Sequence, residues 1–136
     1  MPWWHFDEIA EDYAAARPPY PRAVFDALES AGVVGPGMRV LEIGAGAGLA
    51  TRELTRLGCQ VVALEPGADL SRVLSQTVPG VEVITARLED VELPDGGFQS
   101  VVAATSMHWV DLAVGLPRIH ACLRPPGRLA VWRTIY

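Results

Sequence analysis

The sequence contains no lysine, and its eleven basic residues are all arginine, scattered from Arg17 to Arg133 without a cluster. Sixteen acidic residues bring the net charge to −5, the wrong sign for a surface that binds nucleic acid, because phosphate binding needs gathered cations. We attribute the missing lysine to genome composition, since alanine, glycine, proline and arginine are all frequent. The alternative, selection of arginine for bidentate anion contacts, has no cluster to support it.

Cysteine and long apolar runs are also scarce. The two cysteines, Cys59 and Cys122, lie far apart and predict no disulfide framework, so we expect a reduced, cytoplasmic protein. The apolar stretches are only as long as strands, which predicts no transmembrane helix. Residues 1–8 lack the basic and apolar regions of a signal peptide. The 136 residues, half of them hydrophobic, suffice for one domain with its own core.

Short apolar runs alternate with helical patterns after an N-terminal segment, residues 1–20. This alternation predicts right-handed crossovers and a parallel sheet covered on both faces. We therefore predict a single α/β domain with a Rossmann-like, doubly wound sheet in the strand order 3-2-1-4-5. The predicted strands are 38–43, 60–64, 81–85, 99–105 and 128–135. The predicted helices begin at Pro21, Leu49, Ala68 and Leu112, and a turn is predicted at Pro125-Pro126-Gly127.

Three glycines follow the first predicted strand, at positions 44, 46 and 48. In a doubly wound sheet the ligand lies beyond the carboxyl ends of the strands, where the strand order reverses. Glycine permits a positive φ and lets a ligand approach the backbone, and the next helix directs its free N–H groups toward that ligand. Taken alone, the glycines also fit a tight turn that binds nothing.

Two acidic residues accompany the glycines and distinguish between ligands. Glu65 ends the second predicted strand, where an acid accepts hydrogen bonds from both hydroxyls of a ribose. A dinucleotide fingerprint needs its third glycine at position 49, but that residue is Leu49 and the glycine is Gly48. Glu42, two residues before Gly44, suits the amino group of S-adenosylmethionine and would repel a pyrophosphate. The pattern therefore favours S-adenosylmethionine over NAD.

Five segments together resemble a known family along nearly the whole chain. Residues 40–48 look like motif I of class I S-adenosylmethionine-dependent methyltransferases, and residues 86–98 resemble their loop after the third strand. Residues 106–111 are similar to the His-Trp segment after the fourth strand, and residues 123–129 to the turn before the fifth. Residues 13–21 look like the N-terminal segment of small-molecule methyltransferases of the trans-aconitate methyltransferase-like group.

The resemblance implies a cofactor site built from three segments. The glycine turn would hold the methionine part of the cofactor, and Glu65 its ribose. Leu88 would offer its backbone N–H to the adenine ring. Many relatives carry an acid for the adenine amino group where this chain has Arg87, so the chain departs from the pattern there. The implied cofactor residues are Glu42, Gly44, Ala45, Gly46, Gly48, Glu65, Pro66, Arg87, Leu88 and Glu89.

The end of the sequence is a second departure. Family members usually continue with a helix and an antiparallel strand pair after the fifth strand, whereas this sequence stops at Tyr136. The fifth strand, with Leu129, Val131 and Trp132, would then be an apolar edge, which folded proteins normally cover. We expect a C-terminally truncated domain, a fragment of a longer chain, or an edge that pairs with another copy in a homo-oligomer.

The remaining candidate residues concern the methyl acceptor. His108 follows the fourth strand and is a candidate base or substrate contact, or else a histidine that only fixes its loop. Trp109 would wall the pocket. Tyr13, Arg17 and Tyr20 either form a lid, with Arg17 binding an anionic substrate, or merely dock the N-terminal helix. No group of histidine, cysteine and acidic residues has the spacing of metal ligands, so we expect no metal.

Three functions follow, of which the first is preferred. It is an S-adenosylmethionine-dependent methyltransferase that transfers a methyl group by in-line displacement to a small molecule, at a carboxylate or a hydroxyl. The second is a non-catalytic module that binds the same cofactor and needs a partner chain. The third is an NAD(P)-dependent oxidoreductase, which Leu49 argues against. None of the three involves nucleic acid or a membrane.

Overall fold

A parallel sheet of five strands organises the part of the chain that the computed structural model describes, residues 19–133. The strands lie in the order β3-β2-β1-β4-β5, and every neighbouring pair is parallel. This confirms the predicted fold class and strand order. The strands are β1 (Arg39–Ile43), β2 (Gln60–Leu64), β3 (Glu82–Ile84), β4 (Phe98–Ala104) and β5 (Leu123–Trp132).

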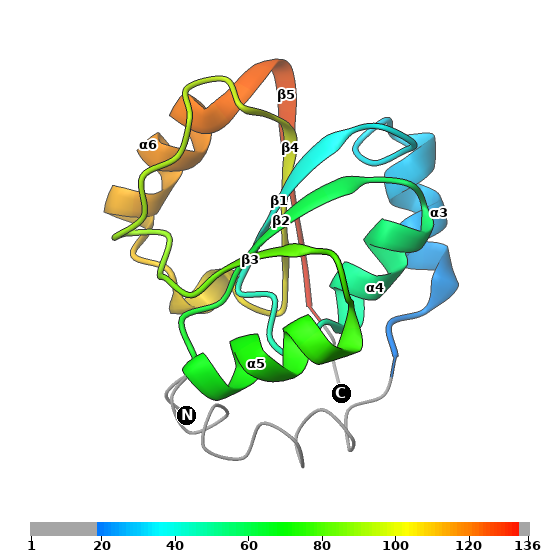
Figure 1. The fold of residues 1–136 in the computed structure, drawn as a ribbon. Coiled ribbons are helices and arrows are strands. Elements are labelled where there is room, and N and C mark those ends of the chain that lie inside the picture. The colour runs from blue at the N-terminus through cyan, green and yellow to red at the C-terminus, as the bar shows by residue number, and fades with distance from the viewer. Residues whose placement is uncertain (1–18, 134–136) are drawn as a thin grey trace.

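Helices cover both faces of this sheet (Figure 1). On one face, α3, α4 and α5 contribute Phe25, Leu54 and Leu74 to a buried cluster with the strands. On the other face, α6 contributes Ile119 and Cys122 to a second cluster. Among the described residues, no helix is long and apolar enough to cross a membrane. The helices are α3 (Arg22–Ser30), α4 (Leu49–Arg56), α5 (Ala68–Thr77) and α6 (Leu112–Cys122), with the short 3-10 helix η1 (Met107–Trp109) before α6.

The beginnings of the helices reflect their local sequences. Pro21 precedes α3 and already has the φ of a helix start, −58°. Asp111 caps α6, because its Oδ1 accepts a hydrogen bond of 3.0 Å from the Ala113 N–H. By contrast, α4 follows Gly48 and has no side-chain cap. The first N–H groups of α4 are therefore left without a side-chain acceptor at the end where β1 leaves the sheet.

Pro125, Pro126 and Gly127, predicted as a turn before the fifth strand, lie within the bounds of β5. The chain already pairs at Leu123, opposite Phe98, and pairs again at Arg128, opposite Ser100. The prolines therefore lie in an irregular stretch within β5, where the register shifts. Within residues 19–133, β5 forms an edge of the sheet. An edge strand tolerates proline because one side of its backbone needs no ladder hydrogen bonds.

Candidate functional site

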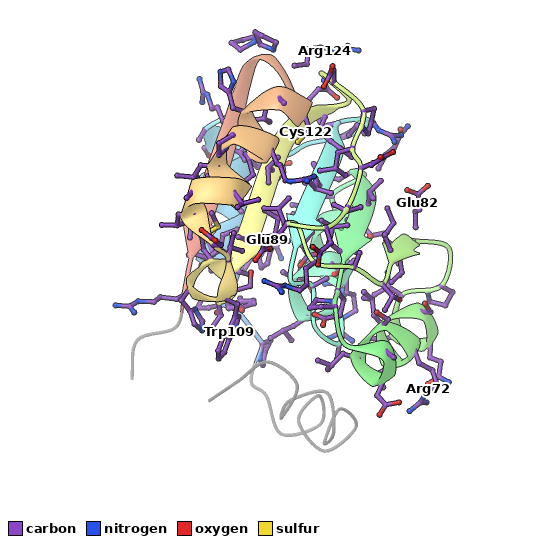
Figure 2. All side chains as sticks on the ribbon, turned by 90° about the vertical axis from the view of Figure 1, so that its left-hand side faces the viewer. Arg72, Glu82, Glu89, Trp109, Cys122 and Arg124 are labelled. Carbon is purple, nitrogen blue, oxygen red and sulfur yellow. The ribbon has the colours of Figure 1, made fainter. Side chains whose placement is uncertain are left out.

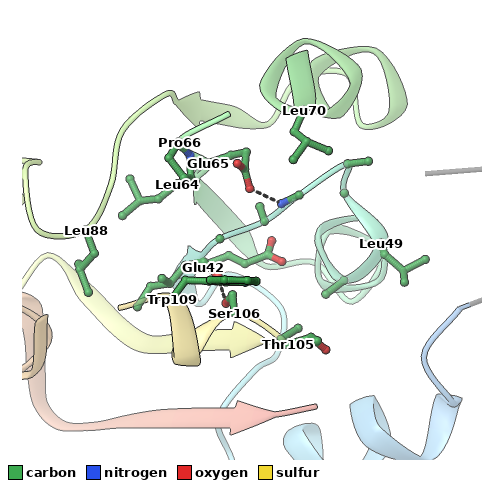
Figure 3. Close-up of a pocket in the computed structure, with 18 of the residues that line it drawn as sticks. Glu42, Leu49, Leu64, Glu65, Pro66, Leu70, Leu88, Thr105, Ser106 and Trp109 are labelled. Atoms are coloured by element: carbon green, nitrogen blue, oxygen red, sulfur yellow. Dashed lines mark hydrogen bonds between the residues drawn. The ribbon is translucent and has the colours of Figure 1, made fainter. Parts of the chain in front are cut away.

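The carboxyl ends of β1, β2 and β4 surround a cavity of about 480 Å³. The turn after β1 and the start of α4 form one wall, while the end of β2, the loop after β3 and η1 form the others (Figure 3). All of the residues predicted to hold a cofactor line this cavity, although they come from three separate segments. Their meeting point is the place that the strand order predicts for a ligand.

The glycine turn, residues 44–48, adopts a backbone conformation that favours glycine, because φ is +62° at Gly44, +60° at Gly46 and +99° at Gly48. A Cβ on Gly44 would lie 2.6 Å from the Ser106 Cβ, and one on Gly48 would lie 2.6 Å from the Leu74 Cδ1. A Cβ on Gly46 would meet no atom within 4 Å. Gly44 and Gly48 are therefore required by packing, whereas Gly46 lines the cavity and leaves space beside it.

Glu65, at the end of β2, joins that strand to the glycine turn. Its side chain is buried, with Oε1 accepting a hydrogen bond of 2.8 Å from the Gly46 N–H (Figure 3). Oε2 accepts one of 2.7 Å from the Gly67 N–H. A carboxylate offers several acceptor positions on its two oxygens, and Glu65 lines the cavity. Pro66, the next residue, also lines the cavity.

Glu42, in β1, is a second acid in the same cavity, and it is only 1% exposed. The Thr51 hydroxyl, from the first turn of α4, donates to its Oε1 at 2.5 Å. Burial raises the pKa of Glu42 from its ordinary value of 4.5 to about 8; the hydrogen bond from Thr51 lowers it, and the charge of Glu65 raises it further. At neutral pH this carboxyl is therefore mostly protonated.

The loop after β3 brings Arg87, Leu88 and Glu89 to the cavity. The Leu88 side chain is buried in the core on the α6 face. The Arg87 Nη2 donates to the Glu89 Oε2 at 2.6 Å, so these two predicted cofactor residues are paired with each other. The opposite charges therefore largely neutralise each other at this wall.

The segment after β4 forms the wall where a methyl acceptor was predicted. His108 and Trp109 both line the cavity, with their ring centroids 4.4 Å apart and their planes tilted by 45°. The Tyr20 hydroxyl lies 2.8 Å from the Thr105 Oγ1, and both residues line the same cavity. Thr105 has a φ of +56°, a conformation that costs energy for a β-branched residue and often marks functional sites.

Sequence reasoning missed Thr51, Thr105 and Ser106. Thr51 is fully buried beneath Glu42, and the Ser106 hydroxyl donates to the Ile43 carbonyl oxygen at 2.7 Å. Ser106 thereby holds the end of β4 against the beginning of the glycine turn. The hydroxyl residues belong to no spacing pattern. Only the position of Thr51, in the first turn after the glycines, offered a signal.

Two predicted lid residues, Tyr13 and Arg17, lie outside the described residues. Tyr20 is described, and its ring packs edge-on against Trp132 at a centroid distance of 5.9 Å. Within residues 19–133, no three histidine, cysteine, aspartate or glutamate side chains gather as metal ligands would. Both cysteines of the sequence are free and buried.

Comparison with known proteins shows that methyltransferases of other organisms are similar to this chain in sequence. An uncharacterized methyltransferase of Mycobacterium tuberculosis is 37% identical over 130 residues, which cover 95% of this chain and 52% of the relative. An uncharacterized methyltransferase-like protein of Schizosaccharomyces pombe is 29% identical over 131 residues, covering 95% and 51%. The chain therefore spans about half the length of the curated relatives it matches.

Solved structures and a family model agree with this. A structure described as a candidate type II methyltransferase of Anaeromyxobacter dehalogenans is similar with a TM-score of 0.76 and 31% identity, covering 88% of this chain and 50% of that one. A SAM-dependent methyltransferase of Aquifex aeolicus shares the fold, with a TM-score of 0.70 and 23% identity, covering 78% and 61%. The model of the methyltransferase domain matches residues 41–131, from β1 into β5. The chain belongs to the methyltransferase domain family.

Proposed function

We propose that this chain binds S-adenosylmethionine in the cavity at the strand ends and transfers its methyl group to a small molecule, at a hydroxyl or a carboxylate. The observation that carries the proposal is the glycine turn between two acids. Gly46 leaves open space in the cavity, while Glu42 and Glu65 present carboxyl groups to the same space. A cofactor with an ammonium group and a ribose matches both of these acids.

The residues present fit each part of that cofactor. Glu65 lines the cavity with a carboxylate, the group that accepts hydrogen bonds from the two hydroxyls of a ribose. Glu42 is buried with a hydroxyl as its hydrogen-bond donor, so an ammonium group would give its carboxylate a charged partner. The start of α4, which lacks a side-chain cap, offers N–H groups to the carboxylate of the methionine part. Leu88 and Pro66 would flank the adenine ring.

The chemistry demands little of the protein beyond orientation. When bound, S-adenosylmethionine supplies a methyl group on a sulfonium, and a lone pair of the acceptor forms the new bond to carbon as the C–S bond electrons go to sulfur. The chain has to align the acceptor with that bond and exclude water. A hydroxyl acceptor must also lose its proton, and His108 on the acceptor wall is the residue that we assign to take it. A carboxylate acceptor needs no base.

The proposal includes three finer assignments, which concern the lid, the edge of the sheet and the location of the protein. The resemblance of residues 13–21 to the trans-aconitate methyltransferase-like group favours a small-molecule acceptor, and we assign Tyr13, Arg17 and Tyr20 as its lid. The edge of β5, where Val131 is half exposed, would pair with a further strand or with a second copy of the chain. The two free cysteines support a cytoplasmic location.

A matched pair of glycine variants tests the proposed cofactor site. Gly46 and Gly80 both have a positive φ and free space for a Cβ, but only Gly46 lines the cavity. We expect Gly46→Ala and Gly80→Ala to lose a similar stability, about 1–2 kcal/mol, from the left-handed backbone. Gly46→Ala should in addition weaken the binding of S-adenosylhomocysteine at least tenfold, measured by isothermal titration calorimetry.

Thermal melting supplies the control. S-adenosylhomocysteine should raise the melting temperature of the unmodified protein and of Gly80→Ala, whereas NADH should change neither. A shift with NADH and none with S-adenosylhomocysteine would refute the proposed cofactor. An equal loss of affinity in both variants would mean that Gly46 acts through stability rather than through the space beside it.

A further inference from the structure

The loop after β3 (residues 85–97) is attached to the beginning of α6 by a shared carboxylate. The Glu89 Oε2 accepts a hydrogen bond from the Arg87 Nη2 at 2.6 Å and one from the Asp111 N–H at 3.3 Å. Asp111 itself caps α6. The Glu89 side chain is 11% exposed, whereas that of Arg87 is 47% exposed. Glu89 therefore connects two segments that form neighbouring walls of the cavity.

Packing beneath Glu89 joins the same two segments. Gly115, in the first turns of α6, faces Leu88 and Val110 so closely that a Cβ would lie 3.2 Å from the Leu88 Cδ2 and 2.5 Å from the Val110 Cγ1. Leu88 itself is 2% exposed. The absence of a side chain at Gly115 thus lets α6 approach the loop until Leu88 and Val110 both lie against it.

Two further hydrogen bonds extend the attachment along α6. The Arg118 Nη1 donates to the Val91 carbonyl oxygen at 2.6 Å. The Gly96 N–H donates to the Ala121 carbonyl oxygen at 3.0 Å, close to the end of the helix. The loop is therefore held to α6 from one end to the other, and Figure 2 shows Glu89 and Trp109 at the same end of this helix.

The family resemblance implied that Glu89 contacts the cofactor directly. In the structure its Oε2 instead accepts hydrogen bonds from Arg87 and from the Asp111 N–H. We propose that Glu89 is a positioning residue, which couples the loop after β3 to the segment 105–111, so that cofactor bound against Leu88 also fixes His108 and Trp109 on the acceptor wall. This inference rests on the proposed function, because it requires the cofactor in the cavity.

The charge on Glu89 suits this role. Burial works to raise the pKa of Glu89, but the hydrogen bond from Arg87, together with backbone N–H groups that include that of Asp111, outweighs it. The pKa of Glu89 therefore lies below its ordinary value, and the side chain is a carboxylate at neutral pH. An ionised carboxylate accepts both hydrogen bonds at once, and charge strengthens the one from Arg87.

The coupling can be measured without knowing the methyl acceptor. Hydrogen–deuterium exchange of the segment 105–111 would be followed in the full chain with and without saturating S-adenosylhomocysteine, whose affinity is measured by calorimetry. In the unmodified protein we expect the ligand to slow exchange of this segment at least fivefold. In Glu89→Ala we expect affinity within threefold of the unmodified protein, but less than twofold slowing of the segment.

Two other variants distinguish a coupling role of Glu89 from a merely structural one. Glu89→Gln is nearly isosteric and keeps an acceptor for the Asp111 N–H but loses the charge, so its slowing should be intermediate. Glu92→Ala removes an exposed acid from the same loop and should behave like the unmodified protein. A merely structural role for Glu89 would speed exchange equally with and without ligand, which leaves the slowing factor unchanged.

The outcomes are distinct. A loss of affinity of tenfold or more in Glu89→Ala would make Glu89 a cofactor contact and overturn the inference. Full slowing of the segment in Glu89→Ala would overturn it as well. If the unmodified protein binds no S-adenosylhomocysteine, the proposed function itself fails and takes this inference with it.

Discussion

The buried carboxyl of Glu42 should make the stability of the ligand-free protein fall as the pH rises. Its pKa is raised from 4.5 to about 8 by burial. Between these two values the unfolded chain has lost the proton that the folded chain keeps. Stability from this group is therefore complete below about pH 4.5 and is lost as the pH rises through about 8.

The size of the effect follows from that interval. It spans about 3.5 pH units, and each unit corresponds to about 1.4 kcal/mol, so the full loss is about 5 kcal/mol as an upper value. Such a loss is comparable to the whole stability of a small domain. The ligand-free protein should consequently be most stable in mildly acidic solution.

The substitution Glu42→Gln isolates the contribution of Glu42 to the pH dependence of stability. The amide is neutral at every pH and keeps an oxygen that accepts the hydrogen bond from the Thr51 hydroxyl. The variant should lie within about 1 kcal/mol of the unmodified protein near pH 5 and exceed its free energy of unfolding by about 2–5 kcal/mol at pH 8.5. Groups that titrate in both proteins cancel in this difference.

Urea unfolding followed by circular dichroism, from pH 5 to pH 9, measures the difference in free energy of unfolding between the two proteins. Glu92→Gln, at an exposed acid, is the control and should show no such divergence. Parallel curves for Glu42→Gln and the unmodified protein would refute the reasoning, because Glu42 would then titrate alike in the folded and unfolded states. Saturating S-adenosylhomocysteine should flatten the decline, since its ammonium group would stabilise the carboxylate.

Two further predictions concern the acceptor side. Gly115→Ala should destabilise the protein by about 1–3 kcal/mol in urea unfolding, because its Cβ would overlap the Val110 Cγ1. Val110→Ala combined with Gly115→Ala should recover part of that loss, and strictly additive losses would contradict the proposed overlap. His108→Ala should slow methyl transfer to a hydroxyl acceptor about 100-fold, measured as S-adenosylhomocysteine released across a pH series. An unchanged rate would leave His108 with only a role in its loop.

Much of the fold could be predicted because its strands are apolar runs bounded by glycine and proline. The first two strands show this, since the buried residues of Arg39–Ile43 and Gln60–Leu64 are apolar apart from Glu42, and turn residues flank both strands. The fifth strand begins at Leu123, earlier than the predicted Arg128, because the intervening prolines were interpreted as a break before the strand. Proline signals a break in a central strand but is tolerated in an edge strand, and the sequence pattern does not distinguish the two.

The candidate site could likewise be predicted only in part from the sequence. Glycines and acids at strand ends have a spacing that points to a ligand, so Gly46 and Glu65 could be named in advance. Thr51 and Thr105 could not, because their contacts arise from packing between elements. The Arg87 pairing with Glu89 was also invisible, since a charge at a cavity wall looks the same in sequence whether it meets a ligand or a neighbour.

The contact between Glu65 and Gly46 has one more consequence. In the sheet, Ile43 is paired with Leu64, so the residues that follow these two emerge side by side. The two parts of the site are therefore held together by strand pairing, while the distance between them along the chain depends only on the length of α4 and its loops. Homologues with insertions after α4 should keep the same pair. A search for this site should accordingly allow a variable gap and require only that the glycines and the acid follow neighbouring strands.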